Sequence, residues 1–312
     1  MGSYGLWKLG PEVDFYRNTL LMGVGFDSAI PEFDDYTIKL FQTIFSKKGI
    51  HSVRDSFSEN MLRRMGIQNV LNTGCPTMWR LTPEYCATIP TQKAKNVVCT
   101  LTDYCRDEIN DRMMLNILLK SYQTVYFWLQ GRDDLEYICS LGYEDKVSLV
   151  QSDLPSFDAI LEQPDLDYVG TRLHAGIRAL NKRHRSLIVS IDNRAECIHA
   201  DTGLPIIPRK DISEMLEQRI TEEIYSKIYS DILNGTMDAY ASIISNNLNG
   251  VMKRLTSITI IIAIPTLIAS LWGMNVFVPF QHNQWGFLIL SIFMIITTAI
   301  TILWLKKKDL LS

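Results

Sequence analysis

The sequence predicts an α/β domain followed by a helical membrane hairpin, and three observations lead to this prediction. Short β-rich segments alternate with helix-like segments over residues 19–191. Farther along the chain, apolar residues recur at steps of about four, which is typical of one face of a helix. From Leu255 to Leu305 the sequence contains no Asp, Glu, Lys or Arg. The chain therefore changes from a soluble-like composition to a membrane-like one.

The pattern over residues 19–191 predicts a mostly parallel, Rossmann-like sheet. We expect strands within residues 19–26, 67–71, 96–101, 124–129, 146–150, 168–170 and 187–191. Helix-like stretches such as 34–46, 108–120 and 172–181 separate them. Such alternation indicates helices on both faces of the sheet, and it places ligand sites at the carboxyl ends of the strands.

The charge balance argues against nucleic acid as a partner. The chain of 312 residues has 31 basic and 34 acidic side chains, a net charge of -3. No overall basic field is present of the kind that attracts a phosphate backbone. The part before Leu255 is mildly acidic, as in many soluble proteins.

The six cysteines form no CxxC pair and lack a histidine at ligand spacing. This pattern argues against a zinc site or a disulfide framework and favours reduced thiols in the cytoplasm. The N-terminus has no long apolar run of a signal peptide. Leu6 stands where a myristoylation signal has Ser or Thr, so we expect no lipid anchor there.

An apolar stripe follows the α/β part. It comprises Leu216, Ile220, Ile224, Ile228, Ile232, Met237, Ala241, Ile244, Leu248 and Met252. This spacing predicts one long stalk helix over residues 211–254 that runs directly into the membrane part. Asp211 with Glu214 forms a candidate capping box at its start.

The charge-free stretch divides into two spans, 255–272 and 285–305, joined by a turn-rich segment. The second span has 21 residues, or about 31 Å as a helix, close to the thickness of a hydrocarbon core. Lys253 and Arg254 precede the first span, and a basic tail, 306–312, follows the second. Cationic flanks remain on the cytoplasmic side. We therefore expect a multi-pass protein of the cell (inner) membrane with both termini in the cytoplasm.

A family resemblance appears in the membrane part. The segment TMDAYASIISNNLNGVMKRLTSITIIIAIPTLIASLWGMNVFVPF, with Gly273, Met274 and Asn275 before a short outer loop, resembles the CorA family of divalent-cation channels. The similarity covers about residues 218–312. It implies a homopentamer in membrane lipid, with the first span lining a pore for hydrated Mg2+ or Co2+. These ions would be transported, and no tightly bound cofactor is expected.

Helical spacing back from Asn275 gives a candidate pore face. It carries Ser270, Thr266, Ala263, Thr259, Leu255, Met252 and Asn249. Since Mg2+ gives up its water reluctantly, a ring of Asn275 amides could hold the metal through its hydrating waters. Met252 and Leu255 could form an apolar constriction that gates by dewetting. The alternative is that the small and hydroxylated residues serve only helix packing.

Three features depart from the CorA pattern. Trp272 stands where the family usually has Tyr or Phe, and the outer loop, 276–284, has no acidic residue to concentrate cations. The family's cytoplasmic funnel domain is replaced by the α/β part, so its regulatory metal sites do not carry over.

A second resemblance lies in the α/β part. The segments LLMGVGF at 20–26, SVRDSFSENML at 52–62, NTGCPTMW at 72–79 and DYVGTRLHAGIRAL at 167–180, followed by SLIVSIDNR, resemble the polysaccharide pyruvyl transferase family. Those enzymes move a pyruvyl group from phosphoenolpyruvate to a sugar. The resemblance implies Arg54, Arg172 and His174 as catalytic residues and phosphoenolpyruvate as a ligand.

The chemistry of these side chains suits that substrate. Guanidinium forks at Arg54 and Arg172 match a carboxylate and a phosphate. His174 could protonate the vinyl carbon or stabilise the phosphate. Ser56 and Ser58 begin an expected helix whose N-terminus could hold an anion.

The predicted organisation is a remnant or extension, 1–18, a pyruvyl transferase-like domain, 19–210, the stalk, 211–254, the hairpin, 255–305, and the tail. The transferase family normally has two half-domains, and this chain supplies one, so we expect weak or no transferase activity. Three functions stay open. The chain is a divalent-cation transporter with a fused cytoplasmic domain, a pyruvyl transferase tethered to the membrane, or a non-functional fusion of two gene fragments.

Overall fold

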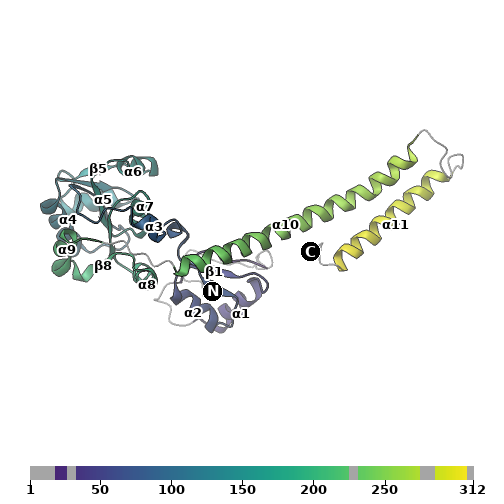
Figure 1. Cartoon of the computed structure of the whole chain (residues 1–312), viewed down its shortest axis with the longest axis horizontal. Helices are drawn as coiled ribbons and strands as arrows, with labels where there is room; N and C mark the ends of the chain where they lie inside the picture. Colours follow the sequence, from purple (N-terminus) through teal and green to yellow (C-terminus); the bar gives the residue numbers. More distant parts are fainter. Residues whose placement is uncertain (1–17, 27–32, 225–230, 275–284, 308–312) are drawn as a thin grey trace. The chain divides into compact units, whose positions relative to one another are not determined.

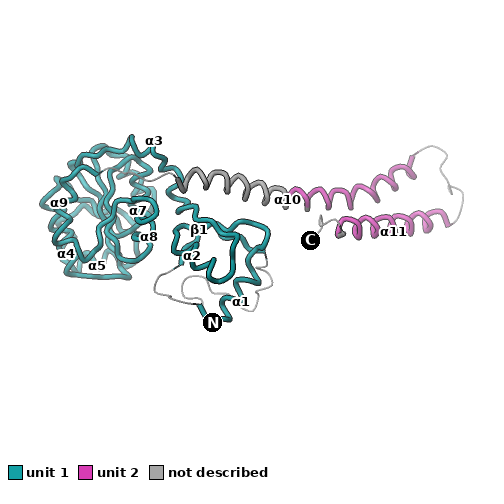
Figure 2. Tube along the Cα trace, turned by 60° about the horizontal axis from the view of Figure 1, so that its bottom comes forward, with its two compact units in different colours: residues 1–239 teal, residues 240–312 magenta. Residues whose placement is uncertain are grey.

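A computed structural model describes residues 18–26, 33–224, 231–274 and 285–307 (Figure 1). The chain forms two compact units, Met1–Ala239 and Tyr240–Ser312 (Figure 2). The expected remnant before residue 18, Asn275, the outer loop and the end of the basic tail lie outside the described residues. The same holds for the side chain of Asn249.

The first unit contains a six-stranded parallel sheet with the order β5-β4-β3-β6-β7-β8. Its strands are β3 (Asn96–Thr100), β4 (Thr124–Trp128), β5 (Ser148–Val150), β6 (Leu166–Gly170), β7 (Ser186–Ser190) and β8 (Ile206–Pro208). The chain builds outward from β3 to β5 and then returns to add β6, β7 and β8 on the other side of β3. This order confirms the Rossmann-like prediction and places the topological switch point between β3 and β6.

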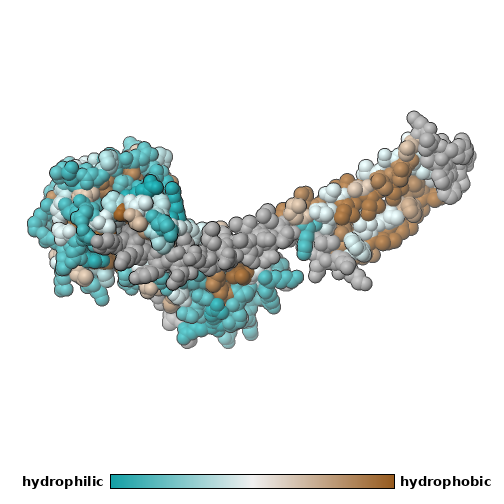
Figure 3. Space-filling model, viewed as in Figure 1, coloured by the Kyte–Doolittle hydropathy of each residue, from teal (hydrophilic) through white to brown (hydrophobic). Residues whose placement is uncertain are grey.

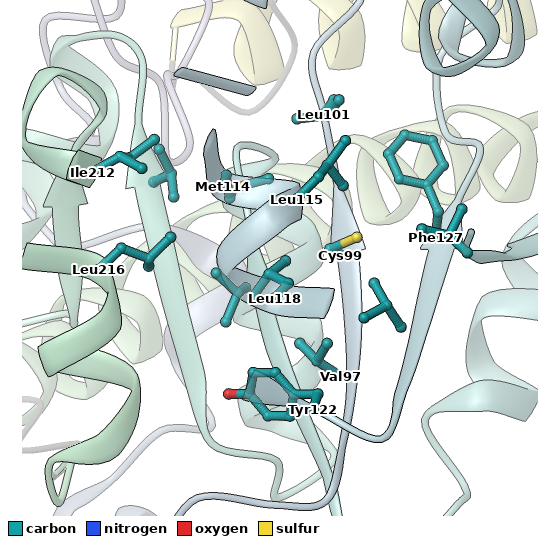
Figure 4. Close-up of a cluster of buried hydrophobic side chains, with 14 of the residues drawn as sticks. Val97, Cys99, Leu101, Met114, Leu115, Leu118, Tyr122, Phe127, Ile212 and Leu216 are labelled. Carbon is teal, nitrogen blue, oxygen red and sulfur yellow. The ribbon is translucent and has the colours of Figure 1, made fainter. Parts of the chain in front are cut away.

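Helices cover both faces of this sheet. One face carries α4 (Glu108–Ser121), α5 (Asp134–Leu141) and α9 (Ile212–Thr221), and the other carries α6 (Leu154–Ile160), α7 (Leu173–Asn181) and α8 (Asn193–Thr202). Side chains of β3 alternate between the two cores: Val97 and Cys99 pack under α4 (Figure 4), and Val98 packs on the opposite face. Strands covered on both faces are mainly apolar, as the central residues Val97, Val98 and Cys99 of β3 are.

Two short elements, η2 (Pro76–Met78) and α3 (Pro83–Cys86), pack on the α7 side of the sheet. We call residues 75–224 the sheet domain. The described residues between 18 and 73 form a separate small lobe with its own apolar core.

The small lobe is built around two parallel strands, β1 (His51–Val53) and β2 (Val70–Asn72), with α1 (Asp35–Ile44) and α2 (Ser56–Arg64). The strand expected over 19–26 is wrong. That segment makes only isolated bridges, through Thr19 and Val24. Gly23 has a φ of 62°, a left-handed conformation that interrupts an extended strand.

The single stalk helix expected over residues 211–254 is also wrong. Helix α9 ends at Thr221, and Glu222 is extended. Two carbonyl groups at this end accept hydrogen bonds from Arg185: Nη2 donates to Ile220 O at 2.8 Å, and Nη1 donates to Glu222 O at 3.0 Å. The first three residues of the apolar stripe, Leu216, Ile220 and Ile224, are buried in the core of the sheet domain, and α9 packs beside α4.

The expected capping box is not formed, because the side chain of Asp211 makes no capping hydrogen bond to α9. Helix α9 instead begins directly after a short 3-10 turn, η3 (Arg209–Asp211).

The second unit contains most of α10 (Asp231–Trp272) together with α11 (Gly286–Lys307). Val251–Trp272 and Gly286–Lys306 are long and apolar enough to cross a membrane. Only 6% of each apolar window is buried within the chain, and Figure 3 shows apolar residues gathered on both helices. Helix α10 continues through Pro265. The described part of the predicted hairpin is therefore helical, with an apolar surface that the rest of the chain does not cover.

Candidate functional site

A pocket opens at the carboxyl ends of the sheet strands, at the switch point. Its volume is about 170 Å³. It is lined by Tyr104, Gln130, Thr171, Arg172, Leu173, His174, Val189, Ile191, Asp192, Arg194 and Ala195. These residues follow β3, β4, β6 and β7, so four separate loops converge there, at the position that open α/β sheets use for ligands.

Arg172 lies in this pocket, as expected, but its guanidinium is already engaged. Nε donates to Leu101 O at 2.8 Å, and Nη2 lies 2.8 Å from Asp103 Oδ1 and 2.9 Å from Asp134 Oδ1. Two carboxylates of the chain therefore hold Nη2, so that nitrogen is not free for the carboxylate or phosphate of a substrate. Burial raises the pKa of Asp134.

His174 lies in the first turn of α7 and lines the pocket. Its Nε2 is 3.6 Å from the Sγ of Cys75. The surrounding protein partly desolvates the ring, and the charges of Arg54 and Arg194 add to this effect, so the pKa of His174 is lowered. The imidazole is therefore neutral at pH 7. A neutral imidazole accepts a proton rather than donating one, which disfavours the expected protonation of the vinyl carbon by His174.

Arg194 is a pocket residue that the sequence reasoning missed. It lies in the first turn of α8, where Nε donates to Asp192 Oδ2 at 2.8 Å and Nη2 donates to the Tyr104 hydroxyl at 3.3 Å. The pairing with Asp192 raises the pKa of Arg194. In the sequence, the signal that could have identified Arg194 is its position as the last residue of the motif SLIVSIDNR.

Arg54 comes from the small lobe, directly after β1. Its Nε donates to Asp55 Oδ2 at 3.3 Å. The guanidinium fits against residue 25 only because that residue is glycine, since a Cβ there would lie 2.0 Å from Arg54 Nε. Arg54 does not line the pocket itself, but its charge acts on His174. The small lobe thus contributes a cation close to the pocket.

The expected anion site at the N-terminus of α2 is already occupied. Ser58 N donates to Asp55 Oδ1 at 2.7 Å, and Ser56 N donates to Asp201 Oδ2 at 2.7 Å. The carboxylates of Asp55 and Asp201 therefore accept the hydrogen bonds from the backbone amides that were expected to bind an anionic ligand.

In the second unit, the candidate pore face is exposed along α10. Met252, Leu255, Thr259 and Thr266 are all exposed, and so are Ala263 and Ser270. The hydroxyls of Thr259 and Thr266 donate to the carbonyls of Leu255 at 2.9 Å and Ile262 at 2.7 Å. A hydroxyl bonded in this way still offers its oxygen lone pairs to water.

A second stripe of α10 is more covered. It consists of Ser257, Ile261, Ile264, Ile268 and Trp272. At 100° per residue these positions centre on the side of the helix opposite the candidate pore face. Gly273 and Met274 follow the end of α10 and are exposed.

Within the described ranges, no group of three or more His, Cys, Asp or Glu side chains could hold a metal ion. Recognition of an ion through its water shell needs no such group.

Comparisons with known proteins match the two regions separately. Residues 6–193 match the family described as polysaccharide pyruvyl transferase, and residues 177–307 match the family described as CorA-like Mg2+ transporter protein. The second match begins earlier than the expected residue 218 and overlaps the first over 177–193, within the sheet domain.

The magnesium transport protein CorA of Wolinella succinogenes is 33% identical over 131 residues. The matched part covers 42% of this chain and 38% of that protein. Among solved structures, a Staphylococcus aureus MnaA–UDP complex has a TM-score of 0.42 and 11% identity, over 72% of this chain and 68% of that one.

Proposed function

The chain belongs to the polysaccharide pyruvyl transferase family and continues into a CorA-like region, and we propose that it conducts hydrated divalent cations across a membrane. Both resemblances expected from the sequence are confirmed by the family matches. Together with the two apolar helices, they indicate a membrane protein. Cation conduction is the function that we assign to its C-terminal region.

The observation that carries this proposal is the separation of the two faces of α10. The more covered stripe centres on Ile264, and the candidate pore face from Met252 to Ser270 lies opposite, within a wider exposed surface that also includes Ile258, Ile262 and Leu267. When several copies place their exposed stripes around one axis, threonine and serine hydroxyls line the outer half of the path. Met252 and Leu255 then form the inner apolar constriction.

Asn275 follows Gly273 and Met274 and completes this path in our proposal. A ring of its amides, one from each copy of a homopentamer, holds Mg2+ or Co2+ through coordinated waters. Met252 and Asn249 mark the inner end. Lys253 and Lys306 flank the spans, so both termini face the cytoplasm.

The test is uptake of Mg2+ by liposomes that contain the purified chain. We expect Asn275→Ala to reduce uptake at least tenfold, while Asn283→Ala, in the same outer segment, retains it. Equal uptake by wild type and Asn275→Ala would contradict the role of Asn275. Uptake no faster than in empty liposomes, for every variant, would contradict conduction and favour a non-functional fusion.

A second candidate function is favoured by the pocket at the switch point. Family membership and the position of Arg194 and His174 in that pocket support phosphoenolpyruvate as its ligand. Arg54 and Arg194 supply positive charge near His174. An anion entering the pocket therefore meets two cations that each pair with one carboxylate, Arg54 with Asp55 and Arg194 with Asp192. Arg172 pairs with two carboxylates.

In pyruvyl transfer, C2 of phosphoenolpyruvate forms two C–O bonds to a sugar diol and loses its C–O bond to phosphate. One hydroxyl proton ends on the vinyl carbon, which becomes a methyl group, and the other leaves with the phosphate. A neutral His174 suits the removal of a proton from a sugar hydroxyl. Arg54 and Arg194 suit the carboxylate and phosphate of the donor.

Calorimetric titration of the full chain with phosphoenolpyruvate tests this pocket. Arg194→Gln and His174→Gln should weaken binding, whereas Lys120→Gln, at an exposed ion pair, should not. Absence of phosphoenolpyruvate binding to the wild type would contradict the pocket assignment.

A further inference from the structure

Asp201 joins the small lobe to the sheet domain through one carboxylate. Its Oδ2 accepts from Ser56 N at 2.7 Å and from Asn72 Nδ2 at 2.9 Å, and its Oδ1 accepts from the Ser56 hydroxyl. The two partners are 145 and 129 residues away in sequence. Hydrogen bonds to an ionised carboxylate are stronger than those between neutral groups, so this contact is a substantial link between the two parts.

The position of Asp201 in its own helix is unfavourable. It lies in the last turn of α8, which ends at Thr202, and a helix C-terminus repels negative charge. Nor does α2 need this carboxylate as a cap, because Asp55 already accepts from Ser58 N. The negative charge of Asp201 is thus unfavourable for α8 and is not needed to cap α2. This combination points to a role for Asp201 elsewhere in the structure.

The two loops that Asp201 holds both lead to His174. Ser56 lies two residues after Arg54, whose charge acts on His174. Asn72 accepts from Gly74 N at 3.0 Å through Oδ1, and the next residue, Cys75, places its Sγ 3.6 Å from His174 Nε2. One carboxylate therefore fixes the two segments that set the surroundings of the histidine.

We propose that Asp201 is a positioning residue that clamps the loops 54–56 and 72–75 and thereby holds the Arg54 guanidinium and the Cys75 thiol at His174. The consequence for anion binding rests on the proposed function of the pocket. The clamp itself does not, since it concerns the placement of protein groups only. Loss of the clamp lets Arg54 move away from His174, which weakens the positive field that an anionic substrate would meet.

The test compares Asp201→Asn with Asp145→Asn in the full chain. The control residue is an exposed aspartate of the same domain, outside the pocket. The first measurement is the NMR titration of His174, which needs no ligand. Because Arg54 contributes to the lowered pKa of His174, we expect Asp201→Asn to raise that pKa and Asp145→Asn to leave it unchanged.

The second measurement is amide hydrogen exchange in peptides that cover 52–62 and 72–79. We expect faster exchange in both for Asp201→Asn and wild-type rates for the control. If Asp201→Asn does not fold, Asn72→Ala replaces it, which removes the hydrogen bond to Asp201 together with the one from Gly74 N. An unchanged His174 titration together with unchanged exchange in a folded variant would overturn the clamp.

The third measurement, the affinity for phosphoenolpyruvate, separates the two proposals. We expect Asp201→Asn to raise Kd about tenfold, the effect of losing one well-placed charge interaction. If the wild type binds no phosphoenolpyruvate while the titration and exchange change as expected, the pocket function fails and the clamp holds. If the wild type binds phosphoenolpyruvate, and Asp201→Asn changes neither the His174 titration nor the amide exchange nor the Kd, the clamp fails and the pocket function holds.

Discussion

The Nη2 atom of Arg172 lies 2.9 Å from Asp134 Oδ1, and that carboxylate is fully buried. Asp134 also accepts from Gly131 N at 2.6 Å. Arg172 therefore ties the loop after β6 to the start of α5, and through Asp103 to the loop after β3. Its first task in this structure is to hold together the loops that surround the pocket.

Replacing Arg172 should destabilise the fold. Arg172→Gln leaves the buried Asp134 without its cation, and breaking such a pair costs about 3 kcal/mol. The free energy of unfolding from denaturant titration measures this loss. Lys120→Gln, which breaks the exposed pair with Glu217, should cost at most about 1 kcal/mol. Equal losses in the two variants would show that the Arg172 pairs contribute no more than a surface contact.

The lowered pKa of His174 predicts a pH dependence of stability. The unfolded chain restores an ordinary pKa of about 6.5, so it binds more protons than the folded chain below that value. The contribution of His174 to stability is therefore present above pH 6.5 and is lost as the pH falls through 6.5 toward the lowered pKa.

His174→Gln removes this contribution. The difference in unfolding free energy between pH 7.5 and pH 5.5 should thus be smaller in the variant than in the wild type. His51, whose pKa is lowered by burial, keeps a dependence of the same sign in both proteins. An identical pH difference in the two would mean that His174 titrates normally in the folded chain.

The hydrogen bonds from Arg185 to the end of α9 predict a local and a global effect. Arg185→Gln removes the partner of Asp167, which is 3% exposed, and should cost about 3–5 kcal/mol. Amide exchange should rise near residues 220–224, because the carbonyls of Ile220 and Glu222 lose their donor. The exposed pair of Lys95 and Asp165 provides the control, through Lys95→Gln. Unchanged exchange in Arg185→Gln would show that another contact ends the helix.

Much of the fold follows from local patterns, and the exceptions have non-local causes. Strands β3 and β4 lie where continuous apolar runs predicted them. Strands β1 and β8, of three residues each, were not among the predicted strand segments. The stripe over α9 gave no sign of a break, because the break depends on Arg185, which lies far away in sequence.

The contacts of the candidate site, like those of the fold, could be predicted only in part from the sequence. The motif around Arg172 and His174 predicted two neighbours of the pocket. The carboxylates that engage its cations, at Asp103, Asp134 and Asp192, come from three other loops. Only the folded sheet brings Asp103 and Asp134 to Arg172, whereas Asp192 lies two residues from its partner Arg194. The sequence motif therefore indicated the arginines but not the ion pairs of Arg172.

The most direct test of the central claim is cysteine block of Mg2+ flux along α10. Thr259→Cys and Thr266→Cys lie on the proposed pore face, and Ile261→Cys and Ile268→Cys lie on the opposite face. In a background without the six native cysteines, a water-soluble cationic thiol reagent should stop flux in the first pair and spare the second. Block of both faces alike, or of neither face in a chain that conducts, would contradict a pore lined by this stripe.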